Sequence, residues 1–128
     1  MAIRNWDFQG LHMDFSSMFD GNDHPSDIDM MYIGKDDFLI LGEIKNEKGI
    51  LPLGQRHLLE DLIKGWHKDG MILYITHNQY WQHGAKSVDV SECQVKEIFY
   101  KAYGKWTLPK RETKVREIIE YYRRHGGR

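Results

Sequence analysis

The chain has 128 residues, 41% of them hydrophobic, which is enough for one domain with its own core, so a single domain over residues 1–128 is expected. Its one cysteine, Cys93, excludes an internal disulfide framework and fits a reducing compartment. No apolar run approaches the ~18 residues of a membrane span, and residues 1–8 do not form a signal-peptide pattern. These features predict a soluble, cytoplasmic protein without a membrane partner.

The net charge of −1 neither favours nor excludes a nucleic-acid partner, but the charge is unevenly distributed. Residues 1–95 hold 8 Lys+Arg and 15 Asp+Glu, a net −7. Residues 96–128 hold 10 and 4, a net +6, and the two parts together restore −1. An acidic part beside a basic tail suits a metal-dependent enzyme acting on a phosphate polymer, whereas the alternative is an ordinary solvated helix at the end of the chain.

The first 23 residues carry aromatic and aliphatic side chains that predict either a short amphipathic helix or a packed arm, ended by the turn residues around Pro25. After it, residues 28–34 and 38–45 read as two antiparallel strands. Residues 35–37 supply the turn between them. With three loop residues, the numbers of paired residues sum to 72, so Asp29 lies opposite Glu43.

Side chains alternate along a strand, so Asp27 shares a face with Asp29 and Glu43 shares a face with Lys45. Both faces of the second strand also carry aliphatic residues, which predicts a strand covered on both sides, where an unpaired charge is costly. Carboxylates of Asp29 and Glu43 at about 5 Å repel each other unless a cation lies between them. A divalent metal ion and the ammonium of Lys45 are the candidates.

A helix follows, because aliphatic residues from Leu53 to Trp66 recur at helical spacing. Gln55 and Arg56 fall in its first turn. Residues 71–76 form a continuous apolar run that predicts a buried central strand. Together these segments make a strand–helix–strand crossover attached to the hairpin, hence an α/β sheet of mixed direction.

The remaining segments are more polar. In the loop after this strand, Tyr80 and Trp81 either stack on bases or pack against their own domain. Residues 88–90 and 95–103 read as edge strands, with a break at residues 104–106. A basic last helix is expected over about 111–125, in which Val115, Ile118, Ile119 and Tyr122 form the apolar stripe and Lys114 and Arg123 lie off it.

Motifs for other chemistries are missing. The seven histidines form no HxH or HExxH pattern and there is no CxxC, which argues against a zinc site. No glycine loop followed by Lys-Ser/Thr offers a phosphate cradle.

Pro25, then Asp27 or Asp29, then Glu43-Ile44-Lys45, with Gln55 opening the next helix, resembles the PD-(D/E)XK nuclease superfamily. This superfamily includes restriction endonucleases and Holliday-junction resolvases, and the resemblance covers a catalytic core of about residues 24–76. It implies an α/β fold with a restriction-endonuclease-like core, in which a mixed central β-sheet of hairpin plus crossover strand is flanked by α-helices.

The resemblance implies a metal-dependent nuclease that hydrolyses phosphodiester bonds, in DNA rather than RNA. Asp29, Glu43 and the backbone carbonyl of Ile44 offer the oxygen ligands that a hard ion such as Mg²⁺ or Mn²⁺ prefers. Asp27 replaces Asp29 if the strand register differs by a residue pair. Lys45 orients the attacking water or meets the phosphate. By the same resemblance, the catalytic set comprises Asp29, Glu43, Lys45 and Gln55.

Other residues are weaker candidates. The predicted substrate contacts are Arg56, Tyr80, Trp81, Lys114 and Arg123. Asp14 and Asp20 occupy the region where some relatives supply a further acidic residue, but they read as surface carboxylates, and His24 reads as a turn residue. A homodimer is expected by analogy.

Two alternatives stay open. The first keeps the fold without cleavage, as a catalytically silent module that binds nucleic acid or protein as a regulator or inhibitor. The second is an unrelated small α/β protein that matches the motif by chance, since an acidic-x-Lys triplet also occurs at residues 112–114.

Overall fold

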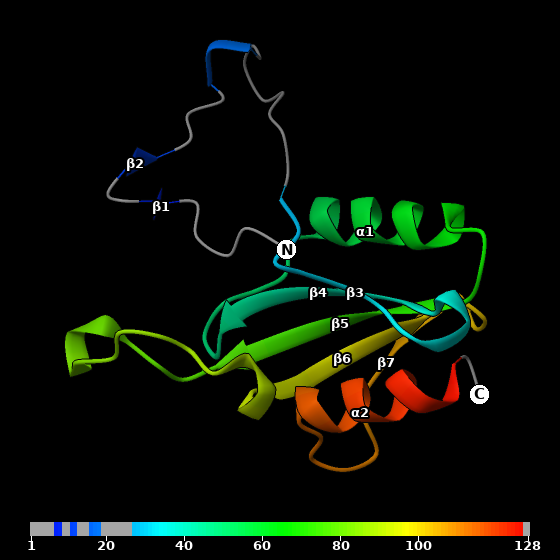
Figure 1. Cartoon of the computed structure of the whole chain (residues 1–128). Coiled ribbons are helices and arrows are strands. Elements are labelled where there is room, and N and C mark those ends of the chain that lie inside the picture. Colours follow the sequence, from blue (N-terminus) through cyan, green and yellow to red (C-terminus); the bar gives the residue numbers. More distant parts are fainter. Residues whose placement is uncertain (1–6, 9–10, 13–15, 19–26, 127–128) are drawn as a thin grey trace.

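A computed structural model describes residues 7–8, 11–12, 16–18 and 27–126 of the chain. Its centre is an open five-stranded sheet in the order β3-β4-β5-β6-β7, with α1 on one face and α2 on the other (Figure 1). The strands are β3 (Met30–Ile33), β4 (Leu39–Asn46), β5 (Gly70–His77), β6 (Gln94–Tyr100) and β7 (Lys105–Thr107), and the helices are α1 (Leu53–Gly65) and α2 (Val115–His125). The predicted α/β class, with a mixed sheet flanked by helices, is confirmed.

Before residue 27 the structure describes only short segments. β1 (Asp7–Phe8) and β2 (Leu11–His12) pair antiparallel, and Ser16–Met18 forms a 3₁₀ turn, η1. The described part of this region therefore contains strands rather than the amphipathic helix that was one of the two expectations. Asp14, Asp20, His24 and Pro25 lie outside the described residues.

The β3–β4 hairpin has the predicted register. Met30 pairs with Gly42 and Ile33 with Leu39, so the paired numbers sum to 72. The turn is the short 3₁₀ element η2 (Lys35–Asp37), in which Asp36 and Asp37 adopt φ values of 57° and 59°. Aspartate tolerates this left-handed region better than most residues. The three-residue turn chemistry seen in the sequence is thus confirmed.

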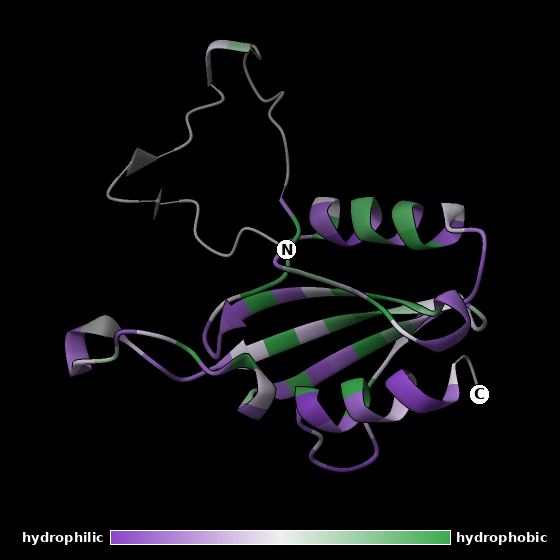
Figure 2. Ribbon diagram, viewed as in Figure 1, coloured by the Kyte–Doolittle hydropathy of each residue, from purple (hydrophilic) through white to green (hydrophobic). Residues whose placement is uncertain are grey.

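The crossover is also confirmed, because β4 and β5 are parallel and α1 connects them. The α1 side of the sheet is closed by a cluster of buried apolar residues: Leu39, Leu41, Leu59, Ile63, Ile72 and Phe99. Figure 2 shows the apolar bands along β4 and β5 and on α1. The parallel pairing brings the carboxyl ends of β4 and β5 to the same edge, close to the first turn of α1 (Figure 1).

The opposite face is covered by α2. Val115 and Ile118 are buried in a second cluster with residues of β4, β5 and β6, and the ring of Tyr122 stacks on Phe38 at a centroid distance of 4.1 Å. β4 is therefore covered on both sides, as its apolar faces predicted. Within the described ranges, neither helix has the length and hydropathy of a membrane span.

The structure corrects the expected strand at residues 88–90. Asp89 instead begins the 3₁₀ element η4 (Val90–Glu92), and its side chain accepts a hydrogen bond from the Ser91 N–H at 3.1 Å. An Asp that bonds the backbone two residues further on stabilises a turn, which overrides the β-propensity of the flanking valines.

Two later boundaries also differ from expectation. Residues 105–107 form β7 and are not a break, since the turn lies just before them, with Gly104 at φ 68°. α2 begins at Val115 and not near residue 111, because the preceding residues are extended along the start of β6. The N–H of Val95 donates to the Thr113 carbonyl at 2.9 Å, and Gln94 forms an isolated bridge with Lys114.

Candidate active site

Glu43 is the one fully buried charged residue in the described part of the chain, at 2% exposure. It lies near the carboxyl end of β4, on the strand face that also carries Leu41, so its side chain points to the α1 side of the sheet. A carboxylate in this position is costly unless it is protonated, paired or bound to a cation.

Asp29 precedes β3 directly and contacts β4. Its Oδ2 accepts a hydrogen bond from the Ile44 N–H at 2.8 Å, so the side chain continues the hairpin ladder where the β3 backbone stops. The N–H and C=O of one strand residue point to the same edge. The Ile44 carbonyl therefore faces the Asp29 side of β4, the side on which it was predicted to serve as a ligand.

Lys45 supplies the nearest positive charge. Its Nζ lies 3.8 Å from Glu43 Oε1, and its side chain is 31% exposed, so the ammonium lies between the buried carboxyl group and solvent. The other oxygen of Glu43, Oε2, is buried and has no hydrogen-bond partner among the described residues. One oxygen of Glu43 is thus paired weakly and the other is unsatisfied.

The pKa of Glu43 is raised from 4.5 to about 8, first because burial disfavours its charged form and second because Asp29 is negative and can accept a hydrogen bond from the protonated acid. Lys45, by its charge, and Gln55, by hydrogen bonding, act to lower this pKa. The predicted catalytic residues Asp29, Glu43, Lys45 and Gln55 therefore interact in one place. Burial and Asp29 together therefore favour the protonated form of Glu43 when no further cation is bound.

The oxygen donors around Glu43 are few for a metal site. No group of three His, Cys, Asp or Glu side chains able to hold a metal occurs in the residues that the structure describes. The available ligands are two carboxyl groups and one backbone carbonyl. A hard cation would bind the Glu43 Oε2 atom, which has no hydrogen-bond partner among the described residues. Asp27, the alternative ligand, is exposed, and it is Asp29 that acts on Glu43.

Arg56, a predicted substrate contact, is engaged within the protein. Its guanidinium donates to both oxygens of Glu97 on β6, from Nη1 to Oε1 at 3.2 Å and from Nη2 to Oε2 at 2.8 Å. It also lies 4.6 Å from the ring centroid of Trp106 and 5.6 Å from that of Tyr74. These contacts fasten the first turn of α1 to the sheet.

Glu97 and Tyr74 were not identified from the sequence. Tyr74 pairs with Glu43 on one side and Glu97 on the other, so the three residues form a row across β4, β5 and β6. The Tyr74 hydroxyl donates to the Gly49 carbonyl at 3.0 Å, which holds the loop after β4 over this row. The signal that was available is the pair Lys96-Glu97 inside an apolar strand, because two consecutive charges interrupt strand alternation.

Tyr80 lies at the same edge of the sheet as Lys45. Its hydroxyl is 3.5 Å from Glu47 Oε1, just beyond β4, and its ring contacts His83 edge-on. Trp81 belongs to a 3₁₀ turn, η3 (Trp81–His83). A polar pocket of about 360 Å³ opens beside this loop and includes Thr76, the strand partner of Lys45.

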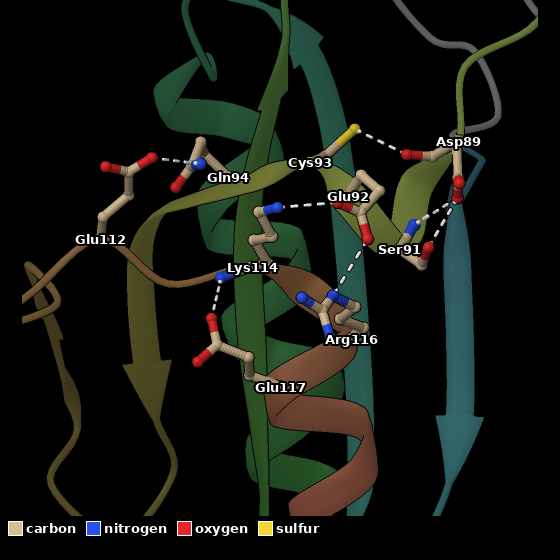
Figure 3. A network of polar contacts seen from close by, with 9 residues as sticks. All are labelled: Asp89, Ser91, Glu92, Cys93, Gln94, Glu112, Lys114, Arg116 and Glu117. Atoms are coloured by element: carbon tan, nitrogen blue, oxygen red, sulfur yellow. Dashed lines mark hydrogen bonds and ion pairs between the residues drawn. The ribbon is translucent and has the colours of Figure 1, made fainter.

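Lys114 directly precedes α2 and Arg123 lies in its last turn. Because α2 covers the face of the sheet opposite to α1, the fold does not bring either residue to Glu43. Figure 3 shows that Lys114 donates to Glu92 at 2.7 Å, while Arg116 contacts the other oxygen of Glu92 at 3.0 Å. The Lys114 N–H in turn donates to Glu117 at 2.8 Å. This network fixes the start of α2 against the segment before β6.

No family model, no curated protein and no solved structure matches this chain.

Proposed function

We propose that the protein is a metal-dependent nuclease with a PD-(D/E)XK active site, which hydrolyses phosphodiester bonds in DNA. The observation that carries this proposal is the buried, unpartnered Oε2 of Glu43, next to Asp29 and with Lys45 at its solvent side. A purely structural carboxylate at 2% exposure would be expected to have both oxygens satisfied.

Asp29, Glu43 and the Ile44 carbonyl would hold one Mg²⁺ or Mn²⁺. When bound, such an ion lowers the pKa of water and offsets negative charge on the phosphoryl oxygens. Lys45, already within 3.8 Å of Glu43 and partly exposed, meets the phosphate or hydrogen-bonds the attacking water. Gln55, in the first turn of α1, acts by hydrogen bonding to favour the charged form of Glu43 and would help to keep that carboxylate oriented.

The raised pKa of Glu43 couples metal binding at the site to the release of a proton. Because burial raises the pKa of Glu43 to about 8, binding of an ion there would require loss of the Glu43 proton and would strengthen as the pH rises toward 8. Activity is therefore expected to increase over this pH range because Glu43 loses its proton, and not because the attacking water does.

The test is a cleavage assay with Mg²⁺, Mn²⁺ or EDTA on plasmid, linear duplex, single-stranded DNA, RNA and a four-way junction. Wild type is compared with Glu43→Gln, Lys45→Met and Asp29→Asn, and with Asp27→Asn as the matched control. The proposal expects metal-dependent cutting that Asp27→Asn retains and the other three variants lose. In parallel, Mn²⁺ should raise the melting temperature of wild type and not of Glu43→Gln.

A folded wild type that cuts no substrate, and whose melting temperature Mn²⁺ leaves unchanged, would contradict the nuclease. The second candidate is then a catalytically silent nuclease-fold module that binds nucleic acid or protein. It is favoured by one observation, that Asp29 Oδ2 is already occupied by the Ile44 N–H, which reduces the oxygens left for an ion. Binding of the same nucleic acids without cleavage and without metal dependence would support it.

A further inference from the structure

β6 contains a β-bulge directly beside the row formed by Glu43, Tyr74 and Glu97. Tyr74 pairs with Glu97 and Ile75 with Val95, so Lys96 is an extra residue without a partner on β5. Bulges of this kind are frequent beside active sites, where they redirect a side chain.

The bulge decides where Lys96 points. Val95 and Ile98 are both buried in the cluster under α2, although they lie three residues apart. In a regular strand, residues three apart face opposite sides of the sheet. The extra residue therefore turns both Lys96 and Glu97 to the α1 face, where Glu97 meets Arg56 and the Lys96 Nζ lies 5.3 Å from the ring centroid of Tyr74.

Lys96 helps to lower the pKa of Glu97 through its charge, but it makes no close ion pair among the described residues. Lys96 is exposed and forms no ion pair with any carboxylate in the described ranges, and its neighbour Glu97 already has both oxygens bonded to Arg56. Strands lie ~4.8 Å apart, so the backbone of Lys96 on β6 is about 10 Å from that of Glu43 on β4. Lys45 and Lys96 thus present two cations on the same face, on either side of Tyr74.

We propose that Lys96 binds a backbone phosphate of the nucleic acid, adjacent to the phosphate at Glu43. The inference rests on the proposed function and extends it, because it adds a second phosphate contact, on β6, to the one proposed for Lys45 on β4. A phosphate next to the reacting one is held equally before and during cleavage, so Lys96 contributes to substrate binding and not to the chemical step. The competing explanation is that Lys96 only covers the Tyr74 ring.

The experiment measures binding of a fluorescent DNA duplex by anisotropy, in Ca²⁺, as a function of salt concentration. The proteins are wild type, Lys96→Gln, Lys96→Arg and the control Lys105→Gln, whose exposed lysine lies on β7 and alternates to the α2 face. Loss of one phosphate contact lowers the slope of log K against log [salt] by about 0.9. We expect this change in Lys96→Gln, recovery in Lys96→Arg and a wild-type slope in Lys105→Gln. KM for cleavage should rise in Lys96→Gln at constant kcat.

A wild-type salt slope in Lys96→Gln, with only a lower melting temperature, would overturn the inference and assign Lys96 to packing on Tyr74. A wild type that binds the duplex but does not cut it in Mg²⁺ or Mn²⁺ would contradict the nuclease alone, since the salt slopes still decide whether Lys96 contacts phosphate. Absence of binding to any nucleic acid by wild type would overturn both.

Discussion

Glu43 and Glu97 lie on either side of Tyr74, on the same face of the sheet, yet their environments are opposite. Both oxygens of Glu97 accept hydrogen bonds from Arg56, which lowers the pKa of Glu97. Glu43 has an ammonium 3.8 Å from one oxygen, its other oxygen has no close hydrogen-bond partner among the described residues, and burial raises its pKa to about 8.

The difference shows how one residue type serves two purposes within a single row. A bidentate Arg–carboxylate pair satisfies all the polar atoms and joins α1 to β6, so it needs nothing further. A buried carboxyl group with an unsatisfied oxygen costs stability unless a ligand completes it. The first arrangement is structural, and the second is the one expected of a binding or catalytic site.

The largest expected contrast between the two carboxylates is in activity. Glu43→Gln should reduce metal-dependent cleavage by more than about 100-fold, because losing even a group that only supports a metal ligand costs about 10–100-fold. Glu97→Gln should leave the rate per folded molecule close to that of wild type. Steady-state kinetics on the best substrate, with the folded fraction measured by circular dichroism, checks this. Equal losses in both variants would remove the functional distinction.

The next contrast is in stability. Arg56→Met leaves Glu97 without its partner, and removing one member of a buried ion pair costs about 3–5 kcal/mol. Because these side chains are 19% and 21% exposed, we expect a smaller cost than that range, ~2–3 kcal/mol. Lys45→Met should cost less than about 1 kcal/mol, because its contact is long and partly solvated. Urea unfolding measures both, and a reversed order would show that Lys45 is the structural partner.

A smaller effect is expected in the pH dependence of stability without metal. Since the pKa of Glu43 is about 8 in the folded protein and 4.5 when unperturbed, the folded state binds the extra proton between these values. The stability that Glu43 contributes is therefore fully present below pH ~4.5 and is lost as the pH rises through about 8. Glu97, with a lowered pKa, acts in the opposite sense and loses its contribution as the pH falls.

Thermal unfolding of wild type and Glu43→Gln from pH 5 to 9 measures this effect. The difference between them should grow in favour of the variant as the pH rises, and saturating Mn²⁺ should remove the decline in wild type. A pH-independent difference would mean that Glu43 does not hold its proton at neutral pH.

The smallest expected effect concerns Asp29, whose negative charge is the second cause of the raised pKa of Glu43. Asp29→Asn removes a negative charge and should lower the pKa of Glu43, which moves the loss of stability to lower pH. Asp27→Asn is the matched control, because it removes the same charge from a neighbouring exposed residue that is not among the main causes of the raised pKa of Glu43. The midpoint of the pH-dependent stability difference is the observable, and equal midpoints in both variants would assign the shift to burial alone.

Much of the fold follows from local patterns. The turn at Lys35–Asp37 predicts the register of the β3–β4 hairpin, and the apolar run after residue 70 predicts β5. The β4–α1–β5 crossover follows from a segment with helical spacing of apolar residues that lies between two strand-like segments. The predicted start of α2 was wrong because residues 113 and 114 remain extended through contacts with β6, and no local pattern encodes that pairing. The predicted break at residues 104–106 was wrong because the turn ends at Gly104 and β7 begins at Lys105.

That Glu43 and Lys45 share a face, and that Asp29 continues the hairpin toward Glu43, follows from the sequence, because strand alternation and turn length are properties of neighbouring residues. Which charges are already paired follows only from the folded arrangement. Arg56 meets Glu97 from 41 positions away, Lys114 meets Glu92 on the other face of the sheet, and a bulge redirects Lys96. Partner choice depends on distances between segments that are remote in the chain, and those distances exist only after folding.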